Sequence, residues 1–341
     1  MNTLIHPRHP WIGWLLMLVV AACQNNDPEE TAATELPVVT VFYAPNALGD
    51  GTYNDSICAG VYRARAAHPF RLHTIVPQSA TEADSLLDDW LRAYPQTTGR
   101  HLLVLACEDY EEPADKYADR LPNDERGHTL LFESRRTDLP VTTFHLSLYG
   151  ASYEAGQLAA LASPSPGSTL ILRANGYSDL LREAADGFAE GYCDATRTLP
   201  DSLTLSDNEK GYFTADELYS MAPLLARQYD FVYPLAGGSI QGLVSYLHTN
   251  EGFYMAGMDA YLNFHSLDIL FSVVKHIRST VEEHLIRWLE GETEPAHTVY
   301  TFDTGRIEIP VSPFYPELSE RQTTLHPLAI EKEQAYENRL H

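Results

Sequence analysis

The feature that most constrains the fold is an alternation of short, β-rich apolar runs with longer amphipathic stretches, which occurs twice along the chain. In the first pass, strands are predicted at 38–43, 70–76, 101–106, 129–132 and 141–146, with helices at 55–67, 82–93 and 113–118. In the second pass, helices are predicted at 152–162, 178–193 and 215–229, with strands at 169–173, 203–205, 231–235 and 253–257. Strands separated by helices form parallel sheets that are covered on both faces. The repeat therefore predicts two similar α/β lobes with a cleft between them.

The C-terminal third continues with a different pattern. Residues 267–289 carry apolar side chains every three or four positions, which predicts one long amphipathic helix. Farther along, Asp303-Thr304-Gly305 separates the apolar runs 297–302 and 306–311, which is typical of a β-hairpin with glycine at a positive φ. Residues 323–341 are polar and are expected to form a terminal extension.

The first 22 residues are typical of an export signal. Arg8 precedes a short apolar core at 11–20, which is too short to span a bilayer comfortably. The Val20-Ala21-Ala22-Cys23 sequence resembles a bacterial lipobox, which implies that Cys23 becomes a lipidated N-terminus. An ordinary cleaved secretory signal is the alternative. The polar residues 23–37 are expected to be a flexible tether between this anchor and a soluble body.

The charge and the cysteines exclude several classes of function. The formal net charge is −24, and loss of Arg8 with the signal makes it one unit more negative, which argues against nucleic acid or an anionic membrane surface as a partner. Besides Cys23, the chain has Cys58, Cys107 and Cys193, without metal-ligand spacing. Buried free thiols are expected, with a Cys58–Cys107 disulfide as the alternative. No cofactor and no metal site are predicted.

A glycine-rich loop at 46–60 follows the first predicted strand. Its glycines allow a sharp turn, and Asn54 or Asp55 suits the N-cap of the next helix. The loop would lie at the carboxyl end of a strand, where open α/β sheets bind ligands. Tyr53 offers an aromatic ring, Asn54 an amide, and Asp50 and Asp55 two carboxylates, a set that suits a small polar ring compound. A plain polar turn with a helix cap is the alternative.

Three further groups follow predicted strands. Residues 236–239, Ala-Gly-Gly-Ser, could bring backbone N–H groups close to a ligand oxygen, although they match neither a P-loop nor a nucleophile elbow. Asp259 could accept hydrogen bonds from two neighbouring hydroxyls, and Lys275 could assist it, although spacing alone favours a solvated lysine. Glu108 and Asp109 could be an acid and a base, ligand acceptors or a hydrated loop.

Six segments, in the same order, resemble the basic membrane protein family, the purine-nucleoside-receptor type of substrate-binding lipoprotein. They are LGDGTYNDSICAGV, YGASYEAGQLAALAS, EAADGFAEGY, VYPLAGGSIQG, GMDAY and LFSVVKHI. The resemblance implies a type I periplasmic-binding-protein architecture, in which two Rossmann-like lobes are hinged by three crossovers. It places the first lobe at 38–146 plus 264–291, the second at 147–263 plus 292–311, and a C-terminal extension at 312–341.

The resemblance also implies roles at the ribose end of a nucleoside site. Tyr53 takes the place of a stacking phenylalanine, and Asn54 matches the family's amide. Asp259 and Lys275 fall where the family holds the ribose hydroxyls, with Gly238 nearby.

At the base end, the resemblance implies a second stacking ring, Tyr212 or Phe213, and a base-reading acid, Glu108 or Asp109. The chain departs from the family where Ala106-Cys107 replaces a Gly-Phe pair.

Taken together, these features predict a lipid-anchored solute-binding protein of the cell envelope, periplasmic or on the cell surface. It would capture a small polar ligand, a nucleoside by resemblance, through lobe closure, and deliver it as a monomer to an ABC-type permease without catalysis. One alternative is a sensory or surface lipoprotein that binds a ligand without transport. The other is an exported nucleoside or glycoside hydrolase that uses Glu108, Asp109 or Asp259 as carboxylates.

Overall fold

The structure is a computed structural model that describes residues 35–163, 165 and 167–340, and the described residues from Leu36 onward form one compact unit. The predicted signal, the lipid anchor at Cys23 and most of the tether lie outside the described residues. Within the described ranges, no helix has both the length and the apolar character needed to cross a bilayer.

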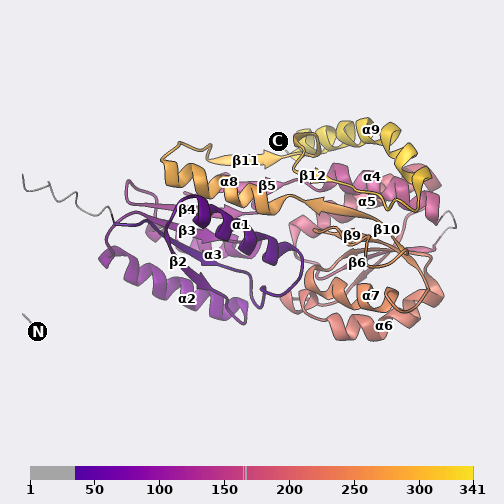
Figure 1. The fold of residues 1–341 in the computed structure, drawn as a ribbon, viewed down its shortest axis with the longest axis horizontal. Coiled ribbons are helices and arrows are strands. Elements are labelled where there is room, and N and C mark those ends of the chain that lie inside the picture. The colour runs from indigo at the N-terminus through magenta and orange to yellow at the C-terminus, as the bar shows by residue number, and fades with distance from the viewer. Residues whose placement is uncertain (1–34, 164, 166, 341) are drawn as a thin grey trace, which may run out of the picture. The chain divides into compact units, whose positions relative to one another are not determined.

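The first of two six-stranded sheets is built from the N-terminal strands and one late strand, all in parallel pairs (Figure 1). Its order is β11-β5-β4-β3-β1-β2, with β1 Val38–Phe42, β2 Arg71–Ile75, β3 His101–Leu105, β4 Gly127–Phe132, β5 Thr142–Leu146 and β11 His297–Tyr300. Four helices belong to this lobe: α1 Tyr53–Ala67, α2 Ala80–Ala93, α3 Glu111–Lys116 and α8 Ile277–Glu290. Helix α1 packs against α8, and Val41 lies in one apolar cluster with Ile57 of α1, whereas Phe42 lies in another with Leu87 of α2. The two faces of the sheet are thus covered by different helices.

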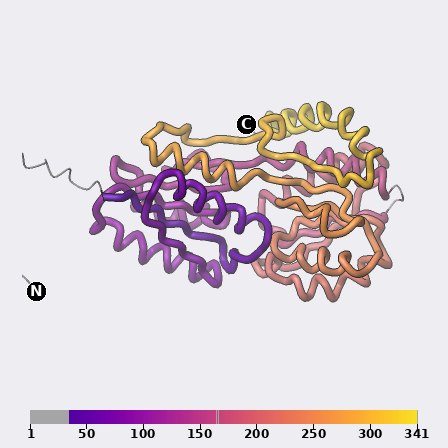
Figure 2. Tube along the Cα trace, viewed as in Figure 1, coloured from indigo at the N-terminus to yellow at the C-terminus, as the bar shows by residue number. Residues whose placement is uncertain are grey.

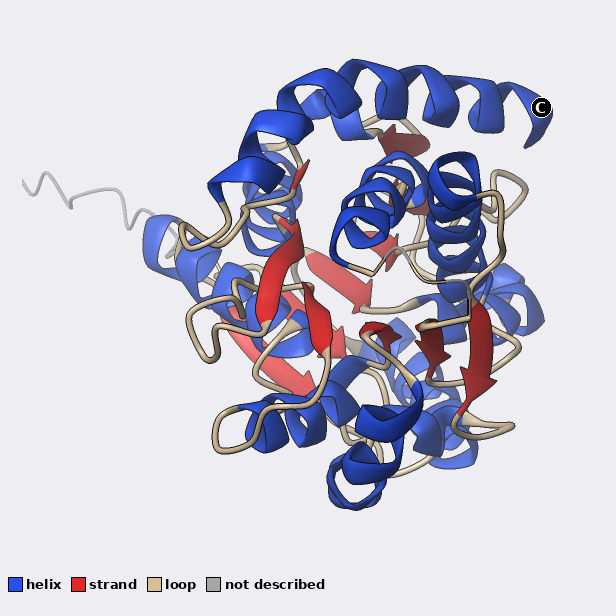
Figure 3. Cartoon of the chain, turned by 90° about the vertical axis from the view of Figure 1, so that its right-hand side faces the viewer, coloured by secondary structure: helices blue, strands red, loops and turns tan. Residues whose placement is uncertain are grey.

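The second sheet has the order β12-β10-β9-β8-β6-β7, in which only β12 is antiparallel to its neighbour. Its strands are β6 Thr169–Arg173, β7 Asp201–Thr204, β8 Phe231–Leu235, β9 Tyr254–Met258, β10 Ile269–Lys275 and β12 Ile307–Glu308. The helices of this lobe are α4 Tyr149–Ala162, α5 Asp179–Thr196, α6 Ala215–Gln228, α7 Ile240–Leu247 and α9 Pro316–Leu340. Figure 3 shows strands enclosed between layers of helices. Helices α4 and α5 approach so closely that a Cβ added at Gly191 would lie 2.0 Å from the Tyr153 carbonyl oxygen.

The chain passes between the two sheets three times (Figures 1 and 2). The first crossing follows β5, the second follows β10, and the third lies between β11 and β12. This arrangement confirms the predicted fold class of two α/β lobes with mostly parallel sheets.

The prediction of one helix over 267–289 is wrong. Residues 269–275 form β10, and the helix α8 begins only at Ile277. Every residue of β10 is buried, so the strand has no polar face to reveal a period of two, and its apolar residues happened to continue the spacing of α8. Val281 and Trp288 do lie on the buried side of α8, as the spacing predicted.

The predicted hairpin around residues 303–305 is also wrong. Gly305 has the expected positive φ of 72°, but β11 lies in the first sheet and β12 in the second, so this turn belongs to the third crossing. The allocation of segments to lobes changes accordingly. Strand β10 joins the second sheet and β11 joins the first, which is the reverse of the predicted assignment.

The polar C-terminal segment is the long helix α9, which packs against α4 (Figure 1). Leu325 and Ala329 are buried there. Glu333 accepts hydrogen bonds from the backbone N–H groups of Gly150, at the first crossing, and Phe302, at the third. Because only a few apolar residues make these contacts, the sequence resembles an extension although the helix is part of the compact unit.

Candidate functional site

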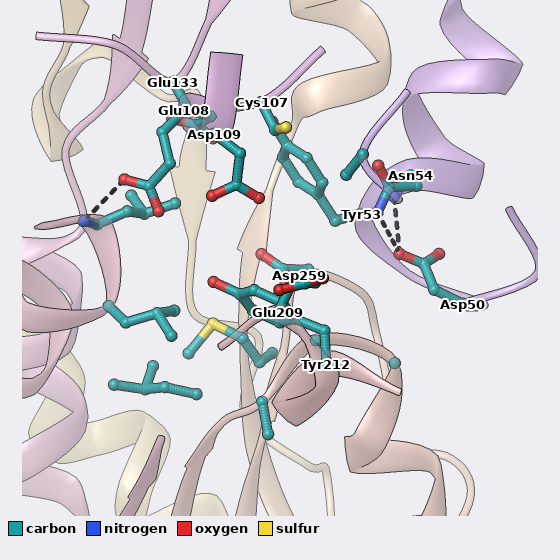
Figure 4. A pocket seen from close by; sticks show the side chains of 18 of the residues that line it. Asp50, Tyr53, Asn54, Cys107, Glu108, Asp109, Glu133, Glu209, Tyr212 and Asp259 are labelled. Carbon is teal, nitrogen blue, oxygen red and sulfur yellow. Dashed lines mark hydrogen bonds between the residues drawn. The ribbon is translucent and has the colours of Figure 1, made fainter. Parts of the chain in front are cut away.

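A cavity of about 100 Å³ is lined by side chains from both lobes (Figure 4). All ten residues predicted to bind ligand lie in its lining: Asp50, Tyr53, Asn54, Glu108, Asp109, Tyr212, Phe213, Gly238, Asp259 and Lys275. Most of them follow the carboxyl ends of parallel strands, which is where open α/β sheets place their ligand sites.

The glycine-rich loop is shaped by Asp50. Its carboxylate accepts hydrogen bonds from the backbone N–H groups of Thr52, Asn54 and Asp55, at 2.9, 2.9 and 3.2 Å, and therefore caps α1. The prediction that Asn54 or Asp55 is the N-cap residue is wrong. Thr52 occupies that position, and Asp50 supplies the capping oxygens. Asp50 thus holds the loop rather than presenting a free carboxylate.

Three buried side-chain oxygens of this loop make no hydrogen bond with the described residues: Thr52 Oγ1, the Tyr53 hydroxyl and Asn54 Oδ1. The last two belong to residues that line the cavity. Burial raises the pKa of Tyr53 well above its usual value, so the hydroxyl stays protonated and can donate. Buried polar atoms are nearly always paired in folded proteins, so two orphans on one cavity wall favour a polar ligand.

Lys275 is the last residue of β10, and its side chain is buried rather than solvated. Its ammonium lies 3.1 Å from Glu133 Oε1, 3.3 Å from Asp259 Oδ1 and 4.3 Å from the centre of the Tyr53 ring. Burial alone would lower the pKa of Lys275, but Asp259 and Glu133 raise it above its usual range. The ammonium is therefore charged and fixed between two carboxylates.

Asp259 follows β9 and has a φ of 65°, in the left-handed region that only glycine adopts freely. Its backbone N–H donates to the Val273 carbonyl at 2.8 Å, which holds this conformation. Burial raises the pKa of Asp259, and Lys275 opposes that shift. Such strain is found at sites where the surroundings determine the backbone, including binding sites.

Glu108 and Asp109 lie in a short 3₁₀ helix, Glu108–Tyr110, and reach the other lobe. The Glu108 carboxylate accepts hydrogen bonds from the Ser178 hydroxyl and, at 3.3 Å, from the Leu180 N–H, at the start of α5. Burial raises the pKa of Glu108 to about 7 and that of Asp109 to about 6, against hydrogen bonds from Ser178 and Tyr177 that lower them. Both oxygens of Glu108 are thus occupied by a contact between lobes.

The raised pKa of the buried Glu108 gives a pH prediction. Because the folded protein holds the Glu108 proton up to about pH 7, the stability that this protonated carboxyl contributes is lost as pH rises from about 4.5 to about 7. Glu108→Gln removes this loss. Across that pH interval, the free energy of unfolding of the variant should therefore rise by on the order of 1–3 kcal/mol relative to that of wild type. Urea unfolding of both proteins between pH 4.5 and 8 measures the difference, and a difference that stays constant with pH would contradict the assignment.

The second lobe contributes an aromatic and glycine wall. Tyr212 and Phe213 have ring centroids 6.3 Å apart at an interplanar angle of 61°, with Phe213 37 % exposed. Gly237 has a φ of 51°, and a Cβ added there would lie 2.8 Å from Tyr212 Cδ1. At Gly238, an added Cβ would lie 3.3 Å from Asp50 Cβ of the first lobe. Gly237 therefore leaves room for the Tyr212 ring within the second lobe, and Gly238 lets this wall approach Asp50 of the first lobe.

Sequence reasoning missed two carboxylates of the lining, Glu133 and Glu209. Glu133 directly follows β4, so the strand-end rule that selected Asp259 would have selected it too. Glu209 begins a short 3₁₀ helix, Glu209–Tyr212, and had no such signal.

The lining is strongly acidic for its size. It contains six carboxylates, which are Asp50, Glu108, Asp109, Glu133, Glu209 and Asp259. Lys275 is the one lysine or arginine side chain among the residues that line it. Within the described residues, no group of three or more His, Cys, Asp or Glu side chains is arranged to hold a metal ion, and Cys58, Cys107 and Cys193 are free. These groups suit ligand hydroxyls and rings, and they disfavour anions.

No family model and no curated protein matches the chain. Solved structures do match. An ABC transporter solute-binding protein from Aeropyrum pernix K1 has a TM-score of 0.67 at 16 % identity, covering 89 % of this chain and 86 % of that one. A transcriptional activator of the comK gene from Bacillus halodurans has 0.60 at 17 %, covering 85 % and 95 %. A carbohydrate transporter solute-binding protein from Agrobacterium radiobacter, in complex with D-arabinose, has 0.60 at 13 %, covering 85 % and 99 %.

At these identities the likeness shows the fold. The two lobes, each with a sheet of mostly parallel strands, agree with that result. The chain has the two-lobed fold of type I periplasmic binding proteins.

Proposed function

We propose that this protein is a solute-binding protein of the basic membrane protein type, which captures a nucleoside between its lobes for delivery to an ABC-type permease. The observation that carries the proposal is that ten residues selected from the sequence, far apart along the chain, line one cavity. The six segments that resemble the family support the ligand class, and the solute-binding proteins among the structural neighbours support the transport role.

The ribose end of the cavity has more hydrogen-bonding groups available for a ligand than the base end. A lysine ammonium has three donors, and two of those of Lys275 are taken by Glu133 and Asp259, which leaves one for a ligand oxygen. Asp259 keeps acceptor capacity beyond its bond with Lys275. A donor beside an acceptor matches two neighbouring hydroxyls, each of which can both donate and accept.

Capture requires groups from both lobes. Tyr53 and Asn54 belong to the first lobe, whereas Asp259, Tyr212 and Gly238 belong to the second, so only a ligand that touches both sets stabilises closure. Stacking contributes about 1 kcal/mol beyond burial, and each hydrogen bond to a charged group contributes about 1.5–3 kcal/mol. A few such contacts reach the roughly 8 kcal/mol of a micromolar complex.

The proposal includes the cell envelope as location. The lipobox-like sequence at residues 20–23 supports a lipid anchor at Cys23, and the polar tether supports a body held at a membrane surface. A sensory lipoprotein with the same fold would bind its ligand without a permease.

A second candidate ligand is a monosaccharide. Both oxygens of Glu108 accept hydrogen bonds from residues at the start of α5, and Cys107 stands where the family has an aromatic residue. The base end therefore has fewer groups available for a ligand than the ribose end. Structural neighbours include a solute-binding protein in complex with D-arabinose and a galactofuranose binding protein.

A thermal-shift screen tests the proposal. The chain from residue 24 onward is mixed with adenosine, guanosine, inosine and uridine, with the free bases, with D-ribose and D-galactose, and with adenosine 5′-monophosphate. We expect one or more nucleosides to raise the melting temperature, and the monophosphate to have no effect because the cavity is acidic. Mass spectrometry of the purified protein identifies anything that co-purifies. A shift with sugars alone would favour the second candidate, and no shift with any compound would reject both.

A further inference from the structure

The two carboxylates that hold Lys275 share an unusual backbone. Among the described residues other than glycine, four have a positive φ, and two of these are Glu133, at 57°, and Asp259, at 65°. Each follows the end of a strand, Glu133 after β4 in the first lobe and Asp259 after β9 in the second. A left-handed conformation is unfavourable for residues with a side chain. The fold therefore bears this cost at both positions that face the same ammonium.

Glu133 has a second contact that Asp259 lacks. Its Oε1 accepts from Lys275 at 3.1 Å, and its Oε2 accepts from the backbone N–H of Leu146 at 3.1 Å. Leu146 is the last residue of β5, where the first crossing begins, and Lys275 is the last residue of β10, where the second begins. One buried carboxylate therefore joins two of the three connections between the lobes.

The surroundings of Glu133 keep it in place. The His145 ring nitrogen Nδ1 lies 3.7 Å from Glu133 Oε2, and the other nitrogen of that ring lies 3.2 Å from the Glu183 carboxylate. Glu183 in turn accepts from the Leu148 N–H and pairs with Arg135. The contacts made by Glu133 thus belong to a buried network that lies along the first crossing.

We propose that Glu133 is a positioning residue of the ligand site, which fixes the Lys275 ammonium for the ligand and ties it to the crossing at Leu146. This inference rests on the proposed function, because it assigns a role in that same cavity. Glu133 takes one donor of Lys275, so the remaining donor has a fixed direction. The strength of a hydrogen bond between a ligand hydroxyl and Lys275 then depends on Glu133, which acts by positioning the ammonium.

The test uses Glu133→Gln, which keeps the size of the side chain and removes its charge. Affinities for adenosine, 2′-deoxyadenosine and 3′-deoxyadenosine are measured by calorimetry. We expect the affinity for adenosine to fall about tenfold or more, and its advantage over the deoxy compounds to shrink, because a misplaced ammonium no longer favours the hydroxyl. A purely structural role would weaken all three compounds alike, and an unchanged advantage would overturn the inference.

The control is Glu294→Gln. Glu294 lies 2.9 Å from His284 in another buried carboxylate–histidine pair, outside the cavity lining. We expect this variant to lower the melting temperature and to leave the preference among the three compounds unchanged. A change in preference equal to that of Glu133→Gln would show that loss of any buried pair has this effect, and would overturn the inference.

A ligand-free measurement separates this inference from the proposed function. In Lys275→Met, two buried carboxylates lack their cation, so adding Glu133→Gln should raise the melting temperature above that of Lys275→Met alone. If wild type binds none of the probes, the proposed function fails, and this double variant still decides whether Glu133 and Lys275 act as a pair. Strictly additive losses of melting temperature would show that they do not.

Discussion

Lys275→Met is expected to lower the free energy of unfolding by about 3–5 kcal/mol at pH 8, because it leaves buried carboxylates without their cation. Glu133 and Asp259 both lie within 3.3 Å of the ammonium, and all three side chains are nearly or fully shielded from solvent. Few single changes should have a larger effect on stability. Urea unfolding measures the loss directly.

The loss should depend on pH with a defined sign. Without Lys275, the pKa of Asp259, already raised by burial, rises further, so the folded variant binds a proton that the unfolded chain releases. The destabilisation is therefore smaller at pH 5 than at pH 8. Lys332→Met is the control, since Lys332 is 29 % exposed where it pairs with Glu190 and Asp194, and it should cost no more than about 1 kcal/mol. Equal losses for the two lysines would contradict the role given to Lys275.

Asp259→Asn is expected to weaken nucleoside binding by at least about 100-fold, since two hydrogen bonds from ligand hydroxyls to a charged oxygen contribute about 3 kcal/mol or more. The test uses asparagine in place of alanine because residue 259 has a φ of 65°, which asparagine adopts more readily than alanine. The thermal shift given by a ribose-bearing compound should disappear. Calorimetry gives the affinity.

The matched control is Asp89→Asn. Asp89 lies on α2 with a side chain that is 73 % exposed, outside the cavity lining, so both the affinity and the thermal shift should stay as in wild type. If Asp259→Asn bound ribonucleosides as tightly as wild type, the hydroxyl-binding role of Asp259 would be wrong.

Much of the fold could be predicted because most strands alternate with helices in a regular way. The predicted bounds 231–235 and 169–173 coincide with β8 and β6. The failure at β10 has a physical cause, since a strand buried on both faces has no alternation to distinguish it from a buried helix. The allocation of β10 and β11 to the sheets depends on long-range pairing, which no local pattern records.

The lining of the cavity was predictable where residue type and strand end coincide, as at Asp259 and in the loop that carries Tyr53. The partners of these side chains were not predictable. Burial of Lys275 depends on its being at the end of a strand rather than on a helix, and the contact of Glu108 with α5 depends on how the lobes meet. These are tertiary properties, and a spacing rule along one segment does not contain them.

The return of β11 to the edge of the first sheet has a genetic consequence. A gene fragment that ends after β5 encodes neither α8 nor β11, so its product would expose the flank of β5 and the face of α1 that packs on α8. Recombination at a single junction therefore cannot exchange the whole first lobe between relatives. It would have to transfer two separate stretches of coding sequence together, which favours descent of the two halves as one inherited block.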